Sequence, residues 1–406
     1  MIQTHLLPNN IRLIHKQIPS KVSHLGFFLN VGAREEMLFE SGVAHAIEHS
    51  LFKGTQKRKG IHIIKRIEDV GGDMNAYTTK EETVFHVSFL AQYYDRMLEL
   101  FSDLLYHAAF PEKEIEIEKE VILEEIRSYE DMPSELIFDD FESLIFGVHP
   151  LGNSILGTQK SVKHLKRNTI LDFYKKHYTN DNIVIASEGN MDFKKLIHQV
   201  QHYFCEPTPN IQTPVRIPFE PAESKTLQVK KRIQQSHCIL GNLAYSIKDE
   251  KRIPFYFLNN ILGGPGMNSR LNLALREKTG LAYNVESNYN FYSDCGLFTI
   301  YFSTEHTQLE ECLHIIKKTL KQLQEQKLGT LQLSNAKTQL IGQLAIANES
   351  NLNDMLSMGR SFLHQIPLET EEEIYRKLEV ITAEELLEIA NEQFNINALS
   401  TLIYSK

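Results

Sequence analysis

His45-Ala-Ile-Glu-His49 is the stretch of this sequence that most restricts its fold and chemistry. Two histidines four residues apart, with a glutamate between them, can present two imidazoles and a carboxylate on one side of a helix. Ser41-Gly42 before the motif and Gly54 after it predict a helix over residues 41–53. The motif reverses the commoner His-Glu-x-x-His order, so the helix would approach a bound metal in the opposite direction. The five residues therefore indicate a metallopeptidase.

A zinc site with two imidazoles needs a third protein ligand and leaves a fourth position for water. The strongly helical segment Glu118-Lys-Glu-Val-Ile-Leu-Glu-Glu-Ile-Arg127 offers candidates. Glu118 and Glu125 are seven residues apart, so they lie within about 20° of each other on a helix, on a stripe of isoleucines. Glu124 points the other way. Because carboxylates on an apolar stripe are costly to bury unpaired, Glu118 and Glu125 are better site candidates than their neighbours.

Both motifs also have a simpler interpretation. In a chain with 17 histidines, the first can be two surface histidines beside a solvated glutamate. The second can be an ordinary acidic helix, since solvated acidic side chains are common throughout residues 112–131. From these residues alone, both interpretations stay open.

Composition limits the class of protein. The chain has 406 residues, 42% of them hydrophobic, and a formal net charge of −9, which argues against a general nucleic-acid binder. No segment is apolar enough to cross a bilayer, and the amino terminus lacks the features of a secretory leader. The four cysteines are far apart and form no CxxC pair. We expect a folded cytoplasmic protein of several domains, complete from its first residue, without a nucleic-acid or membrane partner.

The order of predicted elements divides the chain in two. Five prolines between Glu206 and Ser224 predict a linker at 207–224, between domains 1–206 and 225–406. In the first half, a strand at 25–31 precedes helices near 41–53 and 61–70, a strand-like stretch at 75–90 and a helix near 91–106. The second half repeats this order with segments at 238–246, 252–262, 268–278, 282–303 and 307–325. We predict two homologous α+β domains, each an antiparallel-rich sheet covered by helices on one face.

At this point the sequence resembles the pitrilysin/insulinase family of zinc peptidases, which includes the mitochondrial processing peptidase, and it is most similar to short bacterial members. The resemblance covers both halves in order. It rests on His45-x-x-Glu48-His49, Leu51-Phe-Lys-Gly-Thr55, Gly71-Gly-Asp-Met-Asn-Ala-Tyr-Thr78, Glu118 with Glu125, His149-Pro-Leu-Gly152, Gly263-Gly-Pro-Gly-Met-Asn-Ser-Arg270 and Leu275-Arg-Glu-Lys-Thr-Gly-Leu-Ala-Tyr283. Departures are small: Ala46 and Ser50 replace bulkier residues that are frequent in relatives.

The resemblance implies one zinc ion per chain, bound by His45, His49 and Glu125. It also implies that Glu48 is the general base and that Glu118 helps to order the site. Zinc suits this ligand set best, although cobalt or manganese could replace it in vitro.

The resemblance further implies how a peptide would bind. Asn75, Ala76 and Tyr77 would lie on an open sheet edge, where the substrate adds as a further strand held by main-chain hydrogen bonds. Without the family match, Asn75 beside glycine is an ordinary turn residue.

Arg276 and Tyr283 resemble a pair that relatives supply from the domain facing the zinc, to hold the substrate and stabilise the oxyanion. A helix-end salt bridge and a core tyrosine are the alternative. In short relatives, two chains enclose a chamber, which implies a homodimer. Gly263-Gly-Pro-Gly266 lacks the Gly-Lys-Ser/Thr ending of a phosphate loop, so we do not expect nucleotide binding.

The sequence thus predicts a zinc-dependent endopeptidase that cleaves unfolded peptides or short protein segments. Two alternatives remain: a non-catalytic peptide-binding or scaffold subunit, and the catalytic half of a heterodimeric peptidase. The first would be favoured by loss of a metal ligand or of Glu48, and all of these residues are present.

Overall fold

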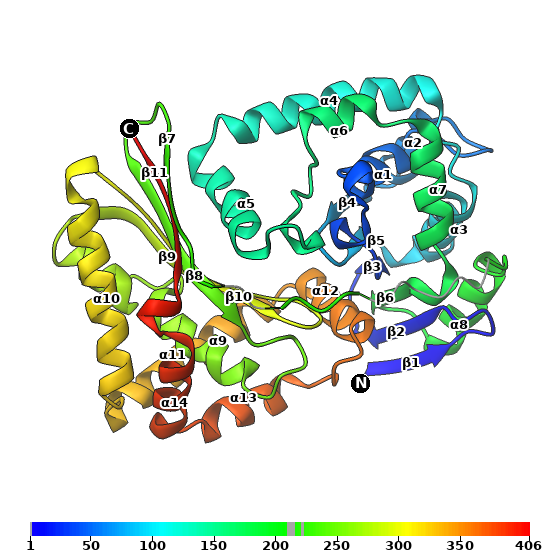
Figure 1. The fold of residues 1–406 in the computed structure, drawn as a ribbon. Coiled ribbons are helices and arrows are strands. Elements are labelled where there is room, and N and C mark those ends of the chain that lie inside the picture. The colour runs from blue at the N-terminus through cyan, green and yellow to red at the C-terminus, as the bar shows by residue number, and fades with distance from the viewer. Residues whose placement is uncertain (1, 209–215, 221–222) are drawn as a thin grey trace. The chain divides into compact units, whose positions relative to one another are not determined.

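The computed structural model describes residues 2–208, 216–220 and 223–406, which form two compact units (Figure 1). Unit 1 consists of the described residues of 1–128, 153–216 and 348–368. Unit 2 consists of those of 129–152, 217–347 and 369–406. No described helix is both long and apolar enough to cross a membrane.

A six-stranded sheet forms the centre of unit 1. Its strands are β1 (Ile2–Leu6), β2 (Arg12–Gln17), β3 (Val22–Leu29), β4 (Asp73–Thr78), β5 (Thr83–Leu90) and β6 (Ile183–Gly189). They are arranged in the order β1-β2-β6-β3-β5-β4. Only the β2–β6 pair is parallel. The predicted strand-like stretch 75–90 is therefore a hairpin, β4–β5, and β4 is an edge strand.

The helices of unit 1 pack their apolar stripes on one face of this sheet. They are α1 (Val43–Leu51), α2 (Gly60–Glu68), α3 (Tyr94–His107), α4 (Glu112–Glu130), α6 (Gln159–His164), α7 (Arg167–His177) and α8 (Phe193–Tyr203). Ile47, Phe101 and Ile122 belong to the core between helices and sheet and are fully buried. This core holds α1 and α4 in fixed positions relative to the sheet.

The sheet of unit 2 repeats the topology of the first. Its strands are β7 (Thr226–Lys230), β8 (Ser236–Ala244), β9 (Ala282–Phe291), β10 (Gly296–Thr304) and β11 (Ser400–Ser405), in the order β7-β11-β8-β10-β9. Again one pair, β7–β11, is parallel and the others are antiparallel. Five strands of unit 1, from β2 to β4 across the sheet, have counterparts here, and β9 corresponds to the edge strand β4. The prediction of two homologous α+β domains is confirmed.

The helices of unit 2 follow the same order as those of unit 1. They are α9 (Arg252–Gly263), a π-helix (Asn272–Glu277), α10 (Leu309–Glu325), α11 (Thr330–Asn348), α13 (Glu371–Val380) and α14 (Ala383–Gln393). The predicted helix at 268–278 thus contains a π-helical turn that periodicity does not reveal.

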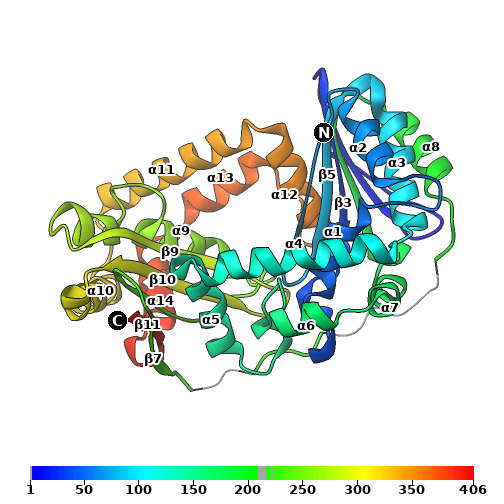
Figure 2. The ribbon, with the colours of Figure 1, turned by 90° about the horizontal axis from the view of Figure 1, so that it is seen from above.

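Each sheet also has a helix on its second face, and that helix comes from the other half of the sequence. In unit 1 it is α12 (Asn351–Leu363), whose Met355 and Met358 pack on Phe28 and Val184. Figure 2 shows this sheet between α12 on one side and α2, α3 and α8 on the other. In unit 2 it is α5 (Pro133–Phe146), whose core includes Phe141.

These two helices make the units discontinuous, whereas the sequence predicted contiguous domains 1–206 and 225–406 with helices on one face of each sheet. The physical reason lies in the central strands. Seven consecutive residues of β3, from Ser23 to Leu29, are buried, so both faces of the strand need cover. Of the predicted linker 207–224, residues 209–215 and 221–222 lie outside the described residues.

Candidate metal centre

The helix that carries the histidine motif begins at a fixed point. Gly42 precedes α1 with a φ of +89°, and a Cβ atom there would lie 2.8 Å from the carbonyl oxygen of Leu156. The buried carboxylate of Glu36 accepts hydrogen bonds from the amides of Gly42 and Ala44, each 2.8 Å long. Because the first amides of a helix have no intrahelical partner, this carboxylate stabilises the start of α1.

Three side chains of α1 lie together at one side of the helix. The rings of His45 and His49 are 4.6 Å apart between centroids, and His45 is only 6% exposed. Glu48 accepts a hydrogen bond of 2.6 Å from the Thr78 hydroxyl at the end of β4. The carboxylate is thereby held between the histidine motif and the edge strand.

Helix α4 brings two carboxylates to the histidines. The distances from Glu125 Oε2 to His45 Nε2 and His49 Nε2 are 3.7 Å and 3.6 Å. Glu118 is buried, lies 3.2 Å from His49 Nδ1 and forms an ion pair of 2.7 Å with Lys53. Glu124, in contrast, is exposed and pairs with Arg127. Glu118 and Glu125 thus lie on the isoleucine face of α4 and Glu124 lies on another face, as the helical wheel predicts.

The donor atoms of His45, His49 and Glu125 fit a zinc ion. All three lie within 4.8 Å of one another. Zinc–ligand bonds of about 2.0–2.2 Å at tetrahedral angles put ligand atoms about 3.3–3.6 Å apart, close to the distances from Glu125 to the two histidines. Among the described residues this is the single cluster of three such side chains with suitable geometry.

The surroundings favour the protonation states that such a site uses. Burial, with a smaller contribution from His49, lowers the pKa of His45 to about 3, which keeps its imidazole neutral. Burial raises the pKa of Glu48, while the hydrogen bond from Thr78 opposes the increase. A neutral imidazole binds a metal ion, and a carboxyl group with a raised pKa is a better proton acceptor than an ordinary one. The Nδ1 atom of His45 is buried and has no hydrogen-bond partner within the described chain.

The predicted substrate strand is at the open edge of the unit 1 sheet. In the described structure β4 pairs only with β5, and α1 packs against β4. The side chain of Asn75 accepts a hydrogen bond of 2.8 Å from the amide of Ala76. The hydroxyl of Tyr77 instead accepts a hydrogen bond from Arg360 of α12, on the other face of the sheet. The Tyr77 hydroxyl is therefore engaged on that face. Of the three predicted residues, Ala76 directs its main chain to the open edge, because the alternating register directs the main chains of its two neighbours to β5.

Arg276 and Tyr283 lie together in unit 2, whereas the histidines and Glu125 belong to unit 1. The Arg276 guanidinium is 5.2 Å from the centre of the Tyr283 ring, and Tyr283 is 74% exposed. Arg276 is on the π-helix, and Tyr283 is on the edge strand β9. Both line a cavity of about 510 Å³ together with residues of α5, among them Glu135. Tyr283 is therefore not a core tyrosine, whereas Arg276 does form an ion pair of 3.7 Å with Glu277 at the end of its helix.

Three residues of the site were not singled out in the sequence: Glu36, Lys53 and Thr78. Lys53 and Thr78 stand within motifs of the family resemblance, yet only folding shows which carboxylate each one contacts. Glu36 lies six residues before the amide of Gly42 that it binds. An acidic residue shortly before a predicted helix was the available signal.

Comparison with protein families gives two matches that together cover most of the chain. The model described as insulinase, peptidase family M16, matches residues 12–159, and the model described as the peptidase M16 inactive domain matches residues 164–340. An uncharacterised zinc protease of Bacillus subtilis is 31% identical over 405 residues, or 99% of this chain and 98% of the relative. Another, of Streptomyces coelicolor, is 35% identical over 88% of this chain and 79% of the relative.

Solved structures share the fold. A peptidase M16 inactive domain from Pseudomonas fluorescens superposes with a TM-score of 0.94 at 20% identity, covering 100% of this chain and 97% of that one. A protease from Helicobacter pylori gives a TM-score of 0.93, also at 20% identity, over 100% and 99% of the two chains. At this identity the likeness concerns the fold alone.

Proposed function

The chain belongs to the insulinase family of peptidases, peptidase family M16, and we propose that it is a zinc-dependent endopeptidase that cleaves unfolded peptides or short protein segments. The observation that carries this proposal is the convergence of His45, His49 and Glu125 beside Glu48. The family is a peptidase family, and the named relatives are zinc proteases. The metal, the endopeptidase activity and the roles below are the proposed part.

In this proposal His45, His49 and Glu125 would hold one zinc ion, which when bound would lower the pKa of a water molecule and polarise the scissile carbonyl. Glu48 would accept a proton from the attacking water and deliver it to the nitrogen of the leaving amine. Thr78 orients the Glu48 carboxylate, and Glu118 orients the His49 ring through Nδ1. The second half of the chain, which matches the inactive-domain model, has no comparable cluster among its described residues, which supports one metal ion per chain.

The substrate would bind as an added strand along β4. It would run beside Asn75, Ala76 and Tyr77, and its main chain would bond to Ala76 after the Asn75 side chain has released the Ala76 amide. Main-chain recognition tolerates many side chains, which suits unfolded peptides. The hydrogen bond between Thr78 and Glu48 links this edge to the proton acceptor.

Arg276 and Tyr283 would hold the substrate backbone and help to stabilise the oxyanion. We place them at the zinc site of a second copy of the chain, so that the active enzyme is a homodimer. Their shared cavity and the exposure of Tyr283 support a role in contacting a ligand. The four cysteines, all free of disulfide bonds, support a reducing, cytoplasmic location.

Metal analysis and a quenched-fluorescence peptide test the core of this proposal. Purified protein should contain about one zinc ion per chain and lose cleavage on chelation, with recovery on adding zinc. Glu48→Gln should keep the zinc and the fold but abolish cleavage. A Glu48→Gln protein with wild-type activity would refute the proposed mechanism, and a zinc-loaded wild type without activity on a broad peptide library would favour a non-catalytic subunit.

Mixing two inactive variants tests the dimer. Glu48→Gln and Arg276→Ala chains, exchanged into one dimer, should regain part of the activity if each site is completed by the partner. Mass-tagged subunits establish that exchange has occurred. Exchange without recovery would contradict completion in trans, and activity only with a separate companion protein would favour a heterodimer.

A further inference from the structure

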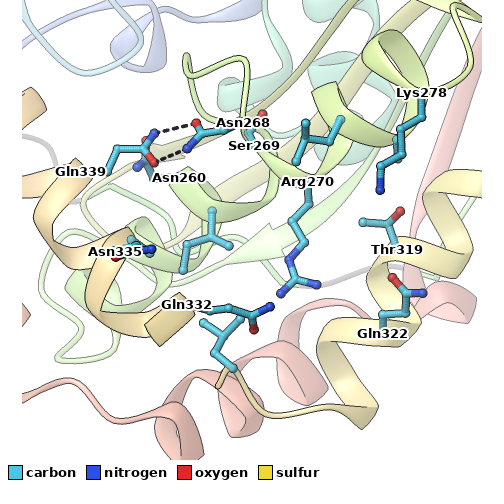
Figure 3. Close-up of a pocket in the computed structure, with 15 residues that line it drawn as sticks. Asn260, Asn268, Ser269, Arg270, Lys278, Thr319, Gln322, Gln332, Asn335 and Gln339 are labelled. Atoms are coloured by element: carbon cyan, nitrogen blue, oxygen red, sulfur yellow. Dashed lines mark hydrogen bonds between the residues drawn. The ribbon is translucent and has the colours of Figure 1, made fainter. Parts of the chain in front are cut away.

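A second cavity of unit 2 lies apart from the Arg276–Tyr283 cavity and has no part in the proposed reaction. It has a volume of about 440 Å³, at the small end of the range for small-molecule sites. Its walls come from α9, the segment 268–278, α10 and α11, as Figure 3 shows. It is therefore built from four neighbouring parts of one unit and is large enough for a small molecule only.

The charge of this cavity is opposite to that of the chain. Its lining contains two basic residues, Arg270 and Lys278, and no acidic residue, although the chain has a net charge of −9. Six of the lining side chains are amides and two carry hydroxyl groups. The cavity thus presents many hydrogen-bond donors and a local positive charge.

Within the residues that the structure describes, Arg270 lacks the partners that other partly buried arginines have, whether carboxylates or, as for Arg12, backbone carbonyl groups. Arg34, Arg58 and Arg360 each form an ion pair with a carboxylate. Neither Arg270 nor Lys278 has such a partner anywhere in the described parts of the chain. Burial lowers the pKa of Arg270, which reflects the cost of keeping its charge there. A charged group that is partly buried without a counter-ion is stabilised when an anion binds beside it.

The polar neighbours of the two cations leave donors directed at the cavity. Gln332 accepts a hydrogen bond of 3.2 Å from the Gly329 amide through its oxygen, so its NH₂ group remains available. Figure 3 shows Arg270 and Lys278 extending into the space that Gln322 and Gln332 border. At the other end, Asn268 and Gln339 form two hydrogen bonds of 2.8 and 3.0 Å with each other. This pair stabilises the wall, whereas the end near Arg270 has unused donors.

We infer that this cavity is a binding site for a small oxyanion, a carboxylate or phosphate group on a compound of low molecular weight. The Arg270 guanidinium provides a planar pair of donors for two oxygens, and Lys278 adds a second positive charge. The amides would bond to the remaining oxygens and to nearby hydroxyl groups. Leu273 and Ala274, which also line the cavity, belong to the π-helix that carries Arg276 on another side. Such π-helical turns are frequent at functional sites.

Calorimetric titration of the full-length protein tests this inference without using peptide cleavage. The probes are inorganic phosphate and citrate, with glycerol as an uncharged comparison. We expect saturable binding of at least one oxyanion and none of glycerol. Arg270→Gln and Lys278→Gln should each weaken that binding about tenfold or more, the effect of losing one charge-assisted contact. Which probe binds more tightly distinguishes a phosphate from a carboxylate site.

Two further variants make the test specific. Lys321→Gln removes a positive charge from the exposed face of α10 in the same unit and should leave binding unchanged. Ala336→Met fills the cavity without altering charge and should weaken binding even if an arginine variant folds poorly. Absence of saturable binding by both oxyanions at millimolar concentration would overturn the inference, as would binding that the two charge variants and Ala336→Met leave intact. Since cleavage is not measured, failure of the proposed peptidase activity would not affect this result.

Discussion

Replacing Glu118 by glutamine tests whether this residue orders the proposed metal centre and thereby strengthens metal binding. Glutamine keeps the size and an oxygen acceptor but removes the negative charge next to His49 Nδ1, 3.2 Å away. It also leaves the Lys53 ammonium group without the carboxylate that it contacts at 2.7 Å. The fold should persist, because the buried side chain is replaced by one of nearly equal volume.

The expected loss follows from these two contacts. A hydrogen bond to a charged group contributes about 1.5–3 kcal/mol and a neutral one about 0.5–1.5 kcal/mol, so the change at His49 costs about 1–1.5 kcal/mol. Glu118 is only 5% exposed, and solvent therefore screens little of this effect. Because Lys53 is one-third exposed, its lost ion pair adds only a little. The total of about 1–2 kcal/mol corresponds to zinc affinity that is about 5–30-fold weaker.

Competition with a zinc-binding dye measures that affinity on the metal-free protein. Glu124→Gln is the matched control, since it makes the same chemical change on the same helix at a side chain that is 74% exposed. Its affinity should stay within about threefold of wild type. Glu118→Gln with wild-type zinc affinity, or equal losses in both variants, would refute the assignment of Glu118 as the residue that orients His49.

Three other perturbations test different parts of the molecule. Burial opposes ionisation of Glu82, but hydrogen bonds from His364 and Arg360 outweigh this effect and lower the pKa of the carboxyl group. Urea unfolding should therefore show that the stability of the wild type falls as the pH drops below about 4.5. The Glu82→Gln protein should be less stable and lose less stability over the same pH range, and equal pH dependence of the two proteins would contradict this. Met355→Ala removes a fully buried side chain of α12 and should lower the free energy of unfolding by about 2–5 kcal/mol, measured by the same method, so a loss below about 1 kcal/mol would show that α12 does not pack on the sheet as described. Glu36→Ala removes the carboxylate that binds the first amides of α1, and calorimetry should show about 1–2 kcal/mol lower stability, whereas an unchanged protein would mean that water replaces it fully.

The candidate metal ligands could be predicted because most of their signal is local, although the family resemblance was needed to choose Glu125 over Glu118. His45 and His49 are four residues apart, and helical periodicity alone distinguishes Glu125 from Glu124. The order of strands and helices was equally accessible, since hydrophobic periodicity marks each element and the second half repeats the first. These features depend on neighbours in the sequence.

Contacts between distant segments were not predictable in this way. The bond from Thr78 to Glu48 joins a strand end to a helix 30 residues earlier, and the ion pair from Lys53 to Glu118 joins two helices. Nothing in the periodicity of α12 says that its apolar face covers β3 and not a sheet of its own half. Such contacts depend on the three-dimensional fold, which brings the two segments together only after both have formed.

Helices α5 and α12, each of which covers a sheet of the other half of the sequence, also limit the order in which this chain can fold. During synthesis the last strand of the unit 1 sheet ends at Gly189, yet the helix that covers its second face begins only at Asn351. Until then Phe28 and Val184 remain exposed on the nascent sheet, although the candidate metal ligands His45, His49 and Glu125 have already been synthesised. The exposed apolar face can bind chaperones and promotes aggregation during that interval. Active enzyme should therefore appear late in translation, and a gene truncated before α12 should yield protein that is degraded rather than a free catalytic half.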